Sequence, residues 1–453
     1  MLTDAIEGAF AQVEEGIRSG PVYPQVSPEQ IRQHLHARYS FARAGSLEEI
    51  TSDVEDMLRR WQVQVTHPRY FGLFNPSVTV ASVVADTLVA LYNPQLASWR
   101  TSPEANEIER YTLDWIAGKF GLPVNTFANF TTGGAEANLT AVLVALTHAF
   151  PQYGERGLRC LDCQPVLYLS EEAHHSFTKI AHMTGLGRQA LRTVPADNAL
   201  RMDIAALQRQ VEEDRKAGLQ PFMVVGTCGT TAAGVIDPLA ALHAYCKSEG
   251  LWFHVDAAWG GAAAISPALR PHLAGIELAD SITCDAHKWL SVPMACGMFF
   301  CRHRSTVVST FHVQTSYMPH KHSEEVLDPY TSTVQWSRRF IGLKLFMSLA
   351  HNGESGYAAM IEHQTRMGDL LRARLAQSGW QIANRTPLPV VCFTRPGLDI
   401  PALLARLKDE QIAWMSETRC AGQPVLRACV TSFKTSEADV LSVVDELNRI
   451  AAR

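Results

Sequence analysis

From about residue 125, short apolar runs alternate with longer stretches of helical pattern, and this alternation constrains the fold more than any other feature. Five runs have the length and composition of buried strands: 126–130, 166–169, 222–225, 252–255 and 281–284. Helix-like stretches such as "AEANLTAVLVALTHAF" and "PLAALHAYCKSEG" lie between them. Strands that alternate with helices predict an α/β fold with a parallel or mostly parallel sheet and helices on both of its faces.

The two ends of the chain carry different patterns. The first 80 residues or so read as helices and loops, because "SPEQIRQHL" and "SLEEITSDVEDMLRRW" each begin with a capping serine followed by glutamate in the first turn. The last hundred residues alternate helix, strand, helix, strand and helix, which is typical of a small α+β unit. We therefore predict a helical segment over 1–80, a large cofactor-binding domain over 81–350 and a small α+β domain over 351–453.

Composition and charge narrow the classes of function. The chain has 453 residues, of which 47% are hydrophobic and 19% charged, as in ordinary globular proteins. Lys and Arg total 40 against 45 Asp and Glu, so the bulk charge offers no basic surface for nucleic acid or an anionic membrane. No apolar run is long enough to span a membrane, and the N-terminus lacks the pattern of a signal peptide. We expect a small-molecule substrate and neither a nucleic-acid nor a membrane partner.

The cysteines and histidines give no pattern of a metal site. The 10 cysteines form no framework, which suits a reducing cytoplasm and predicts a cytoplasmic location. Cys160 and Cys163 have CxxC spacing, but neither a second pair nor flanking histidines accompany them. His174 and His175 are adjacent and lack an HExxH motif, so a hydrolytic zinc is not expected. We predict no metal.

Polar or glycine-rich residues follow directly after each of the five predicted strands. In chain order these are Thr131–Asn138 with its glycine pair, His174–His175, Gly226–Thr231, Asp256 and His287–Lys288. Each feature alone has an ordinary explanation, such as a turn, a helix cap or an interior side chain. In an open parallel sheet, however, ligands bind beyond the carboxyl ends of the strands. The five strand ends are therefore expected to meet at one site.

The combined residues match the needs of pyridoxal phosphate. This cofactor requires an anion-binding turn for its phosphate, a carboxylate at its pyridine nitrogen, a flat side chain against its ring and a lysine for the Schiff base. Gly133–Gly134, Asp256, His174 and Lys288 offer these four groups. Apolar surroundings and nearby cations are expected to lower the pKa of the lysine and expose its free amine. The glycine pair lacks both the dinucleotide and the P-loop pattern.

These residues resemble those of the group II pyridoxal phosphate-dependent decarboxylases, which include aromatic amino acid, glutamate and cysteine sulfinate decarboxylases. The matching motifs, in family order between about residues 60 and 430, are "FTTGGAEANLTA", "EEAHHSFTKIA", "GTCGTTAAGVIDPL", "WFHVDAAWGGAA", "CDAHKWL", "STFHVQTSYMPH" and "WSRRF". The pairing of "HVDAA" with "HKW" is the most specific of these. The resemblance implies a type I PLP-dependent fold and conversion of an L-amino acid to its amine and CO₂.

The resemblance also implies roles for individual residues. Lys288 would form the Schiff base, Asp256 would bond the pyridine nitrogen, and His174 would stack on the ring opposite Ala258. The other cofactor contacts implied are Gly134, Ala135, Thr231, His287 and, from a partner subunit, Ser337. Tyr317, in a polar segment, would protonate the substrate carbon after CO₂ leaves. The resemblance further implies a homodimer with the active site at its interface.

The substrate is less constrained by the sequence. Two segments, "HPRYFGLFNPS" and "NPQLASWRTSP", align with the family's substrate pocket and suggest as pocket residues Phe74, Asn75 and Trp99. Gln95 and Ala97 stand where the aromatic decarboxylases carry apolar and aromatic residues, which argues against an aromatic substrate. Arg427 has two interpretations: it pairs with a side-chain carboxylate of the substrate, or it braces the small domain. The sequence therefore does not identify the amino acid.

Two other functions compete with decarboxylation. One is a PLP-dependent aldehyde synthase or aminotransferase of the same fold, and the other is an inactive relative that acts as a binding or scaffold protein. The presence of both His174 and Tyr317 favours a decarboxylase over the aldehyde-forming relatives. The presence of both Lys288 and Asp256 argues against an inactive protein.

Overall fold

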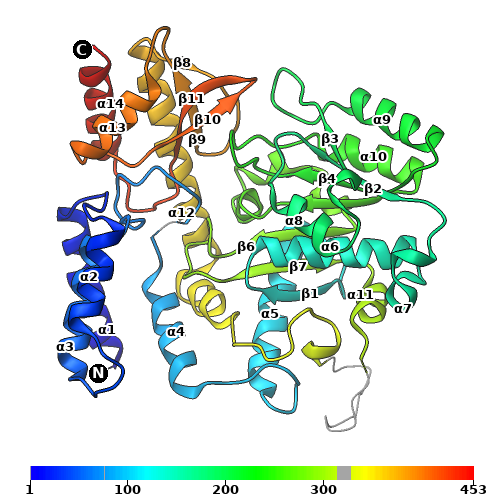
Figure 1. The fold of residues 1–453 in the computed structure, drawn as a ribbon, viewed down its shortest axis with the longest axis horizontal. Coiled ribbons are helices and arrows are strands. Elements are labelled where there is room, and N and C mark those ends of the chain that lie inside the picture. Colours follow the sequence, from blue (N-terminus) through cyan, green and yellow to red (C-terminus); the bar gives the residue numbers. More distant parts are fainter. Residues whose placement is uncertain (1, 76, 314–327, 453) are drawn as a thin grey trace.

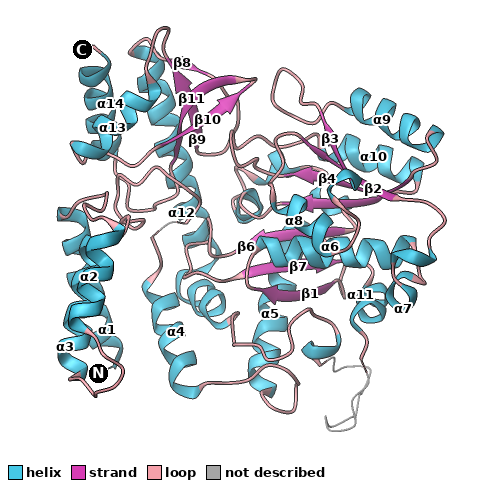
Figure 2. Ribbon diagram, in the orientation of Figure 1, coloured by secondary structure: helices cyan, strands magenta, loops and turns pink. Residues whose placement is uncertain are grey.

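A seven-stranded sheet covered by helices forms the centre of the molecule (Figures 1 and 2). The structure, a computed structural model, describes residues 2–75, 77–313 and 328–452. Three N-terminal helices and a smaller C-terminal sheet lie together along one side of this centre (Figure 1). The predicted α/β class with a mostly parallel sheet is confirmed.

The large sheet contains all five predicted strands. Its strands are β1 Phe127–Thr131, β2 Pro165–Ser170, β3 Leu191–Val194, β4 Gln220–Thr227, β5 Trp252–Asp256, β6 Ser281–Asp285 and β7 Gly297–Cys301, in the order β1-β7-β6-β5-β4-β2-β3. The patterns did not predict β3 and β7. Strands β2 to β6 pair in parallel, whereas β7 is antiparallel to both of its neighbours, β6 and β1. Because β7 reverses the direction twice, β1 runs the same way as β6. The carboxyl ends of the five predicted strands therefore point to one edge of the sheet, as expected.

The helices of the large unit connect these strands. They are α4 Val80–Tyr92, α5 Pro103–Phe120, α6 Gly134–Ala149, α7 Tyr153–Arg156, α8 Ser176–Met183, α9 Ile204–Lys216, α10 Leu239–Glu249 and α11 Arg304–Phe311. Short 3-10 turns lie at Leu158–Cys160, Arg188–Ala190, Gly260–Ile265, Arg270–Leu273, Ile276–Leu278 and Pro329–Thr331. Helix α6 matters most for the site, because it contacts β4, β5, β6 and β7 and begins at the glycine pair.

Two of the three N-terminal helices begin at the serine caps that the sequence predicts. The three helices are α1 Leu2–Ser19, α2 Pro28–Arg38 and α3 Leu47–Arg60. Ser27 forms a capping box with Gln30 at the start of α2, and the Ser46 side chain accepts the Glu49 N–H at the start of α3. Neither α2 nor α3, both described along their whole length, has a buried residue. These helices are thus specified mainly by their caps and local sequence.

The C-terminal part is a small α+β unit. Its elements are α12 Leu343–Gln377, β8 Gln381–Ile382, β9 Val390–Thr394, α13 Ile400–Asp409, β10 Ser416–Cys420, β11 Gln423–Cys429 and α14 Glu437–Ala451, with the antiparallel sheet order β10-β11-β9-β8. The proposed boundary between 350 and 351 falls within α12, near Gly353, where a φ of 67° interrupts the helix. Among the described helices, none is long and apolar enough to cross a membrane.

Candidate active site

Lys288 lies in the turn that follows β6 and is held by a carboxylate of the same turn. Its Nζ is 2.9 Å from Asp285 Oδ2, and its side chain is 22% exposed. Burial is the largest single influence on the lysine pKa and lowers it, but the charges of Asp285 and Asp256 oppose it. The net result is a pKa above the ordinary value. The expectation of a lowered pKa is therefore wrong for the protein without its cofactor, because the two carboxylates outweigh the apolar surroundings.

The pairing with Asp285 gives a testable consequence. In Asp285→Asn, the main carboxylate that raises the Lys288 pKa is lost, so the free amine should exist at lower pH than in the parent. A small aldehyde forms a Schiff base with the free amine, and borohydride makes this label permanent. In apoprotein at neutral pH, Lys288 should be labelled faster in Asp285→Asn than in the parent. The pH profile of labelling should shift to lower pH. An unchanged profile would mean that Asp285 does not control this amine.

Asp256 ends β5 and is fixed through both of its oxygens. Its Oδ1 accepts the backbone N–H of Ala258 at 3.1 Å, and its Oδ2 accepts Asn138 Nδ2 at 2.9 Å. The carboxylate is 5% exposed, and Asn138, from α6, is 1% exposed. The Ala258 carbonyl in turn accepts the N–H of Asp285 at 2.9 Å, which ties the end of β5 to the end of β6. The carboxylate is thus held in one orientation.

The glycine pair lets the start of α6 approach these strand ends. A Cβ on Gly134 would lie 2.9 Å from Asp285 Oδ2 and 3.2 Å from the Cβ of Ala258. A Cβ on Gly133 would lie 3.3 Å from His287 Cε1. Ala135, the next residue of the helix, is exposed. The N-terminus of a 16-residue helix with this open backbone has the form of an anion-binding site and fits the phosphate of the predicted cofactor.

His174 lies at the mouth of the site, just before α8. Its side chain is exposed, but the protein around it still desolvates the ring, and this lowers its pKa. The charges of Asp256, Lys288 and Asp285 all act on the same ring, which puts it close to the other site residues. Its Nδ1 accepts the N–H of Ser176 at 3.2 Å. The lowered pKa favours a neutral, flat imidazole at pH 7, as a ring-stacking residue requires.

His287 and Thr231 border the same region. The His287 ring is buried, its Nδ1 lies 3.1 Å from both the N and the O of Cys296, and desolvation lowers its pKa. Thr231 is exposed, and its carbonyl accepts the Nε of Arg427 at 2.9 Å. Both positions therefore lie at the carboxyl edge of the sheet, where the resemblance implies cofactor contacts.

Three stacked aromatic rings lie beside Lys288. Phe74 stacks on Trp259 with ring centres 4.6 Å apart, and Trp259 stacks on Trp289 at 5.0 Å. The Nζ of Lys288 is 5.8 Å from the centre of the Phe74 ring. The tryptophan that follows Lys288 in the sequence is therefore part of this stack, and Phe74 is the ring that lies near Lys288 Nζ. Its role in the substrate pocket stays a prediction.

Arg427 is buried next to Phe74 and is bound largely to backbone carbonyls. Its Nη1 donates to the carbonyl of Gly72 at 2.6 Å, and its Nε donates to the carbonyls of Thr231 and Ala232. Its guanidinium carbon lies 4.9 Å from the centre of the Phe74 ring. The Nη2 atom is buried without a hydrogen-bond partner among the described residues. These contacts favour the bracing interpretation, because one side chain joins the Gly72 segment, the loop after β4 and the small sheet.

Several predicted residues are not seen at this site in the single chain. Trp99 donates its indole N–H to Glu107 at 2.9 Å and its backbone N–H to Asp328 at 2.8 Å. Asn75 accepts a hydrogen bond from the Tyr70 hydroxyl at 3.3 Å. Ser337 is exposed, and Tyr317 lies outside the described residues. The roles of these four residues stay predictions.

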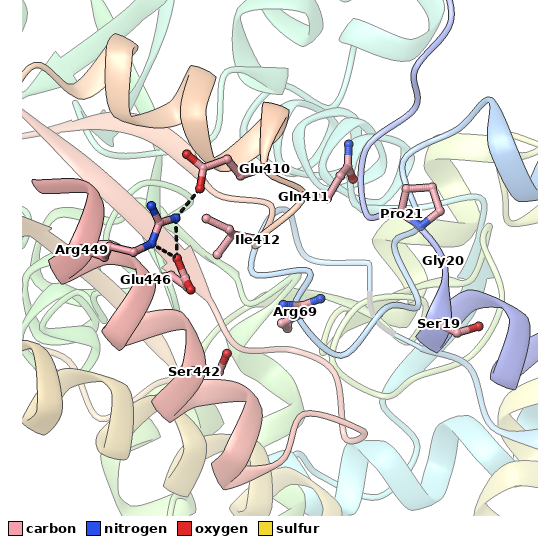
Figure 3. Close-up of a pocket in the computed structure, with 10 residues that line it drawn as sticks. All are labelled: Ser19, Gly20, Pro21, Arg69, Glu410, Gln411, Ile412, Ser442, Glu446 and Arg449. Atoms are coloured by element: carbon pink, nitrogen blue, oxygen red, sulfur yellow. Dashed lines mark hydrogen bonds and ion pairs between the residues drawn. The ribbon is translucent and has the colours of Figure 1, made fainter. Parts of the chain in front are cut away.

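Two other cavities lie apart from Lys288. One, of about 530 Å³, lies between the end of α1 and the small domain, where Arg449 pairs with Glu410 and Glu446 (Figure 3). The other is a groove of about 1070 Å³ beside the edge strand β1, and its lining includes Trp99 and Arg338. No group of three or more metal-ligating side chains occurs in the part of the chain that the structure describes. All 10 cysteines are free.

Three residues of the site were not predicted. Asp285 follows the predicted strand 281–284 and was given no role, whereas it ends β6 and binds Lys288. Asn138 and His254 are buried behind Asp256 and are connected to it by hydrogen bonds. A possible signal for His254 was the period of two in "WFHVD", which puts positions 252, 254 and 256 on one face of the strand.

Comparisons with known proteins agree with this geometry. A family described as "Pyridoxal-dependent decarboxylase conserved domain" matches residues 28–395. The aromatic-L-amino-acid decarboxylase of Sus scrofa is 30% identical over 98% of this chain and 94% of its own length. Tyrosine decarboxylase 2 of Narcissus pseudonarcissus is 30% identical over 85% of this chain and 78% of its own length. Among solved structures, Oryza sativa TDC with PLP and tryptamine superposes with a TM-score of 0.92 at 25% identity, covering 100% of this chain and 96% of that one. Mouse CSAD in apo form has a TM-score of 0.89 at 26% identity, covering 99% of each chain.

Proposed function

The chain belongs to the pyridoxal-dependent decarboxylase family, and from this premise we propose which of its residues bind the cofactor and carry the reaction. It is a PLP-dependent amino acid decarboxylase with a type I fold. The observation that supports the assignment of the site most strongly is the meeting of Lys288, Asp256 and the glycine pair at one edge of one sheet.

The described residues fit the cofactor at each of its parts. The open helix start at Gly134 and Ala135 would receive the phosphate, with His287 and Thr231 at its border, and Ala258 and His174 would flank the ring. Asp256, which is buried and fixed through both oxygens, would hold the ring nitrogen protonated. Pyridoxal phosphate supplies a ring that accepts the electron pair left on the substrate carbon when CO₂ departs. Lys288 would form the Schiff base once its proton passes to a base, and Asp285 Oδ2, at 2.9 Å, is suitably close.

Tyr317 is proposed as the acid that returns a proton to the substrate carbon. Tyr317→Phe keeps the ring and removes the hydroxyl, so amine formation should fall by roughly 10²-fold, the usual range for loss of a general acid. Some flux should be diverted to aldehyde, ammonia and peroxide, because the unprotonated carbon is exposed longer to oxygen. Amine yield and oxygen uptake measure the two routes. Parental amine output without oxygen uptake would assign the proton to His174 or water instead.

We also propose that the protein acts as a homodimer whose interface completes the site. The groove of about 1070 Å³ beside β1, lined by Trp99 and Arg338, offers a surface for a second copy, and Ser337, next to Arg338, is exposed in the single chain. A second copy seated there would bring Ser337 to the neighbouring phosphate site. Sedimentation of the active protein should give twice the mass of the chain. Full activity in a monomer would contradict the shared site.

The substrate class that the site favours is an L-amino acid with an aromatic side chain. The partly exposed Phe74 ring lies beside Lys288 with the buried Trp259 and Trp289 stacked behind it, and the nearby Arg427 is bound to three backbone carbonyls. Gln95, taken as an argument against such a substrate, is exposed and accepts the N–H of Ala97 in its own loop. Relatives named for aromatic, tyrosine and tryptophan decarboxylation support the same class.

A panel of single amino acids tests this assignment. CO₂ and amine should form faster from L-tyrosine or L-tryptophan than from L-glutamate or cysteine sulfinate, by about tenfold or more. Such a ratio corresponds to about 1.4 kcal/mol between the competing transition states. Faster turnover of L-glutamate or cysteine sulfinate would indicate instead that Arg427 Nη2 binds a side-chain carboxylate of the substrate.

A further inference from the structure

A chain of buried hydrogen bonds runs along one face of β5 and ends on Asp256. Its members are Trp252, Ser281, His254, Asn138 and Asp256, and we call it the β5 relay. All five side chains are at most 5% exposed. Positions 252, 254 and 256 share one face of β5, Ser281 lies opposite His254 in the neighbouring strand, and Asn138 comes from α6 above them. The relay therefore joins two strands and a helix behind the site.

Four hydrogen bonds connect the relay. Trp252 Nε1 donates to Ser281 Oγ at 2.9 Å, and Ser281 Oγ lies 2.8 Å from His254 Nδ1. His254 Nε2 lies 3.1 Å from Asn138 Oδ1. Asn138 Nδ2 donates to Asp256 Oδ2 at 2.9 Å. Thr283 Oγ1 is 3.5 Å from Nε2 and makes a weaker contact, and the backbone of Ser281 also interacts with the ring.

The carboxylate end of the relay fixes the direction of the bonds at Asn138 and His254. The indole of Trp252 can only donate, so Ser281 Oγ accepts there and keeps its own hydrogen and a second lone pair for other partners. At the other end, an ionised Asp256 can only accept, so Asn138 presents its NH₂ to the carboxylate and its carbonyl to His254 Nε2. The Asp256 end thus requires a histidine that donates at Nε2 and, when neutral, accepts at Nδ1. Desolvation lowers the pKa of His254 to about 4, so the ring carries one proton at neutral pH.

The opposite histidine tautomer would conflict with Asp256. With its hydrogen on Nδ1, the ring would accept at Nε2, and Asn138 would have to turn its NH₂ toward His254. Its carbonyl oxygen would then face the Asp256 carboxylate, two acceptors in contact in a buried region, which is unfavourable. We propose that His254 is a positioning residue that holds Asn138, and through it Asp256, in the orientation and ionised state which the ring nitrogen of the cofactor requires. This inference rests on the proposed role of Asp256 in cofactor binding.

The histidine tautomer in the apoprotein tests the relay without any catalysis. In protein carrying ¹⁵N-labelled histidine, the His254 ring should show a protonated Nε2 and an unprotonated Nδ1, with the signal assigned by its loss in His254→Gln. Asn138→Leu removes the carbonyl oxygen that accepts the Nε2 hydrogen and so disconnects the ring from Asp256, and the ring should then show a mixture of tautomers. A protonated Nδ1 in the parent, or an unchanged ring in Asn138→Leu, would overturn the relay.

A second readout and a matched control separate the relay from general stability. With ¹⁵N in the ring of bound pyridoxal phosphate, the parent should show a protonated ring nitrogen, and His254→Phe, which removes the Nε2 donor to Asn138, should shift that signal toward the neutral form. Turnover should fall about threefold to tenfold at constant KM. Tyr168→Phe removes another buried aromatic donor in the same sheet, bonded to Asp214 at 2.8 Å, and should leave the signal unmoved. An unprotonated ring nitrogen in the parent would instead contradict the proposed role of Asp256. An equal shift in both variants would overturn the relay as its cause.

Discussion

Lys288→Ala is expected to abolish CO₂ release, with turnover reduced by roughly 10³-fold or more, while the chain remains folded. The variant loses the amine that bonds the cofactor but leaves the strand ends, the glycine pair and Asp256 in place. The loss of one ion pair with Asp285 should lower stability without preventing folding. Turnover and thermal unfolding of the same preparation measure the two effects.

A charge-matched variant separates loss of the amine from loss of the ion pair. Lys288→Arg keeps a cation opposite Asp285, but its guanidinium stays protonated and cannot attack the aldehyde of the cofactor. It should therefore be more stable than the alanine variant and equally inactive. Normal turnover in either variant would remove Lys288 from the reaction.

Asp256→Asn should cost about 10²-fold to 10³-fold in turnover with the cofactor still bound. A neutral amide cannot hold the ring nitrogen protonated, so the electron pair left by CO₂ is stabilised less. The amide has one acceptor oxygen and must turn its NH₂ toward either Asn138 or the Ala258 N–H, both of which donate to the carboxylate.

Asp214→Asn is the matched control for this variant. Asp214 is a buried carboxylate of α9 that accepts the Tyr168 hydroxyl at 2.8 Å and the Nε of Arg192 at 3.0 Å, and it bonds none of the five strand-end segments. Its replacement should lower stability and leave turnover largely intact. Similar losses of turnover in both variants would mean that any buried carboxylate of the large domain matters equally.

The elements that could be predicted from sequence are those whose side chains are buried on both faces. Strands β2, β4, β5 and β6 read as continuous apolar runs, because a central parallel strand has helices over it. β3 was missed because it is a short edge strand with Arg192 and Thr193 in its middle. β10 was not predicted either, because "SETRC" alternates exposed and half-buried positions and has little apolar content. β7, "GMFFC", is buried at every position and carries the same apolar signal, so its omission is a missed prediction with no physical reason behind it.

The site could be predicted only where a residue carries its own motif. Lys288 and Asp256 follow strands directly, so the position of each along the chain locates it at the sheet edge. The raised pKa of Lys288 could not be predicted, because it depends on which side of the turn the Asp285 carboxylate lies. The connection of His254 to Asp256 passes through Asn138, which is more than a hundred positions away in the sequence. Such a pairing is set by the packing of α6 on the sheet.

Covalent trapping of the cofactor tests the central claim most directly. The purified holoprotein would be reduced with borohydride, digested, and each peptide examined for the added mass of the reduced cofactor. The modification should appear on the peptide that contains "CDAHKWL", at Lys288, and should disappear in Lys288→Arg. Reduced cofactor on a different lysine, or a protein that binds the cofactor with no covalent attachment, would contradict the assignment of Lys288 and with it the site described above.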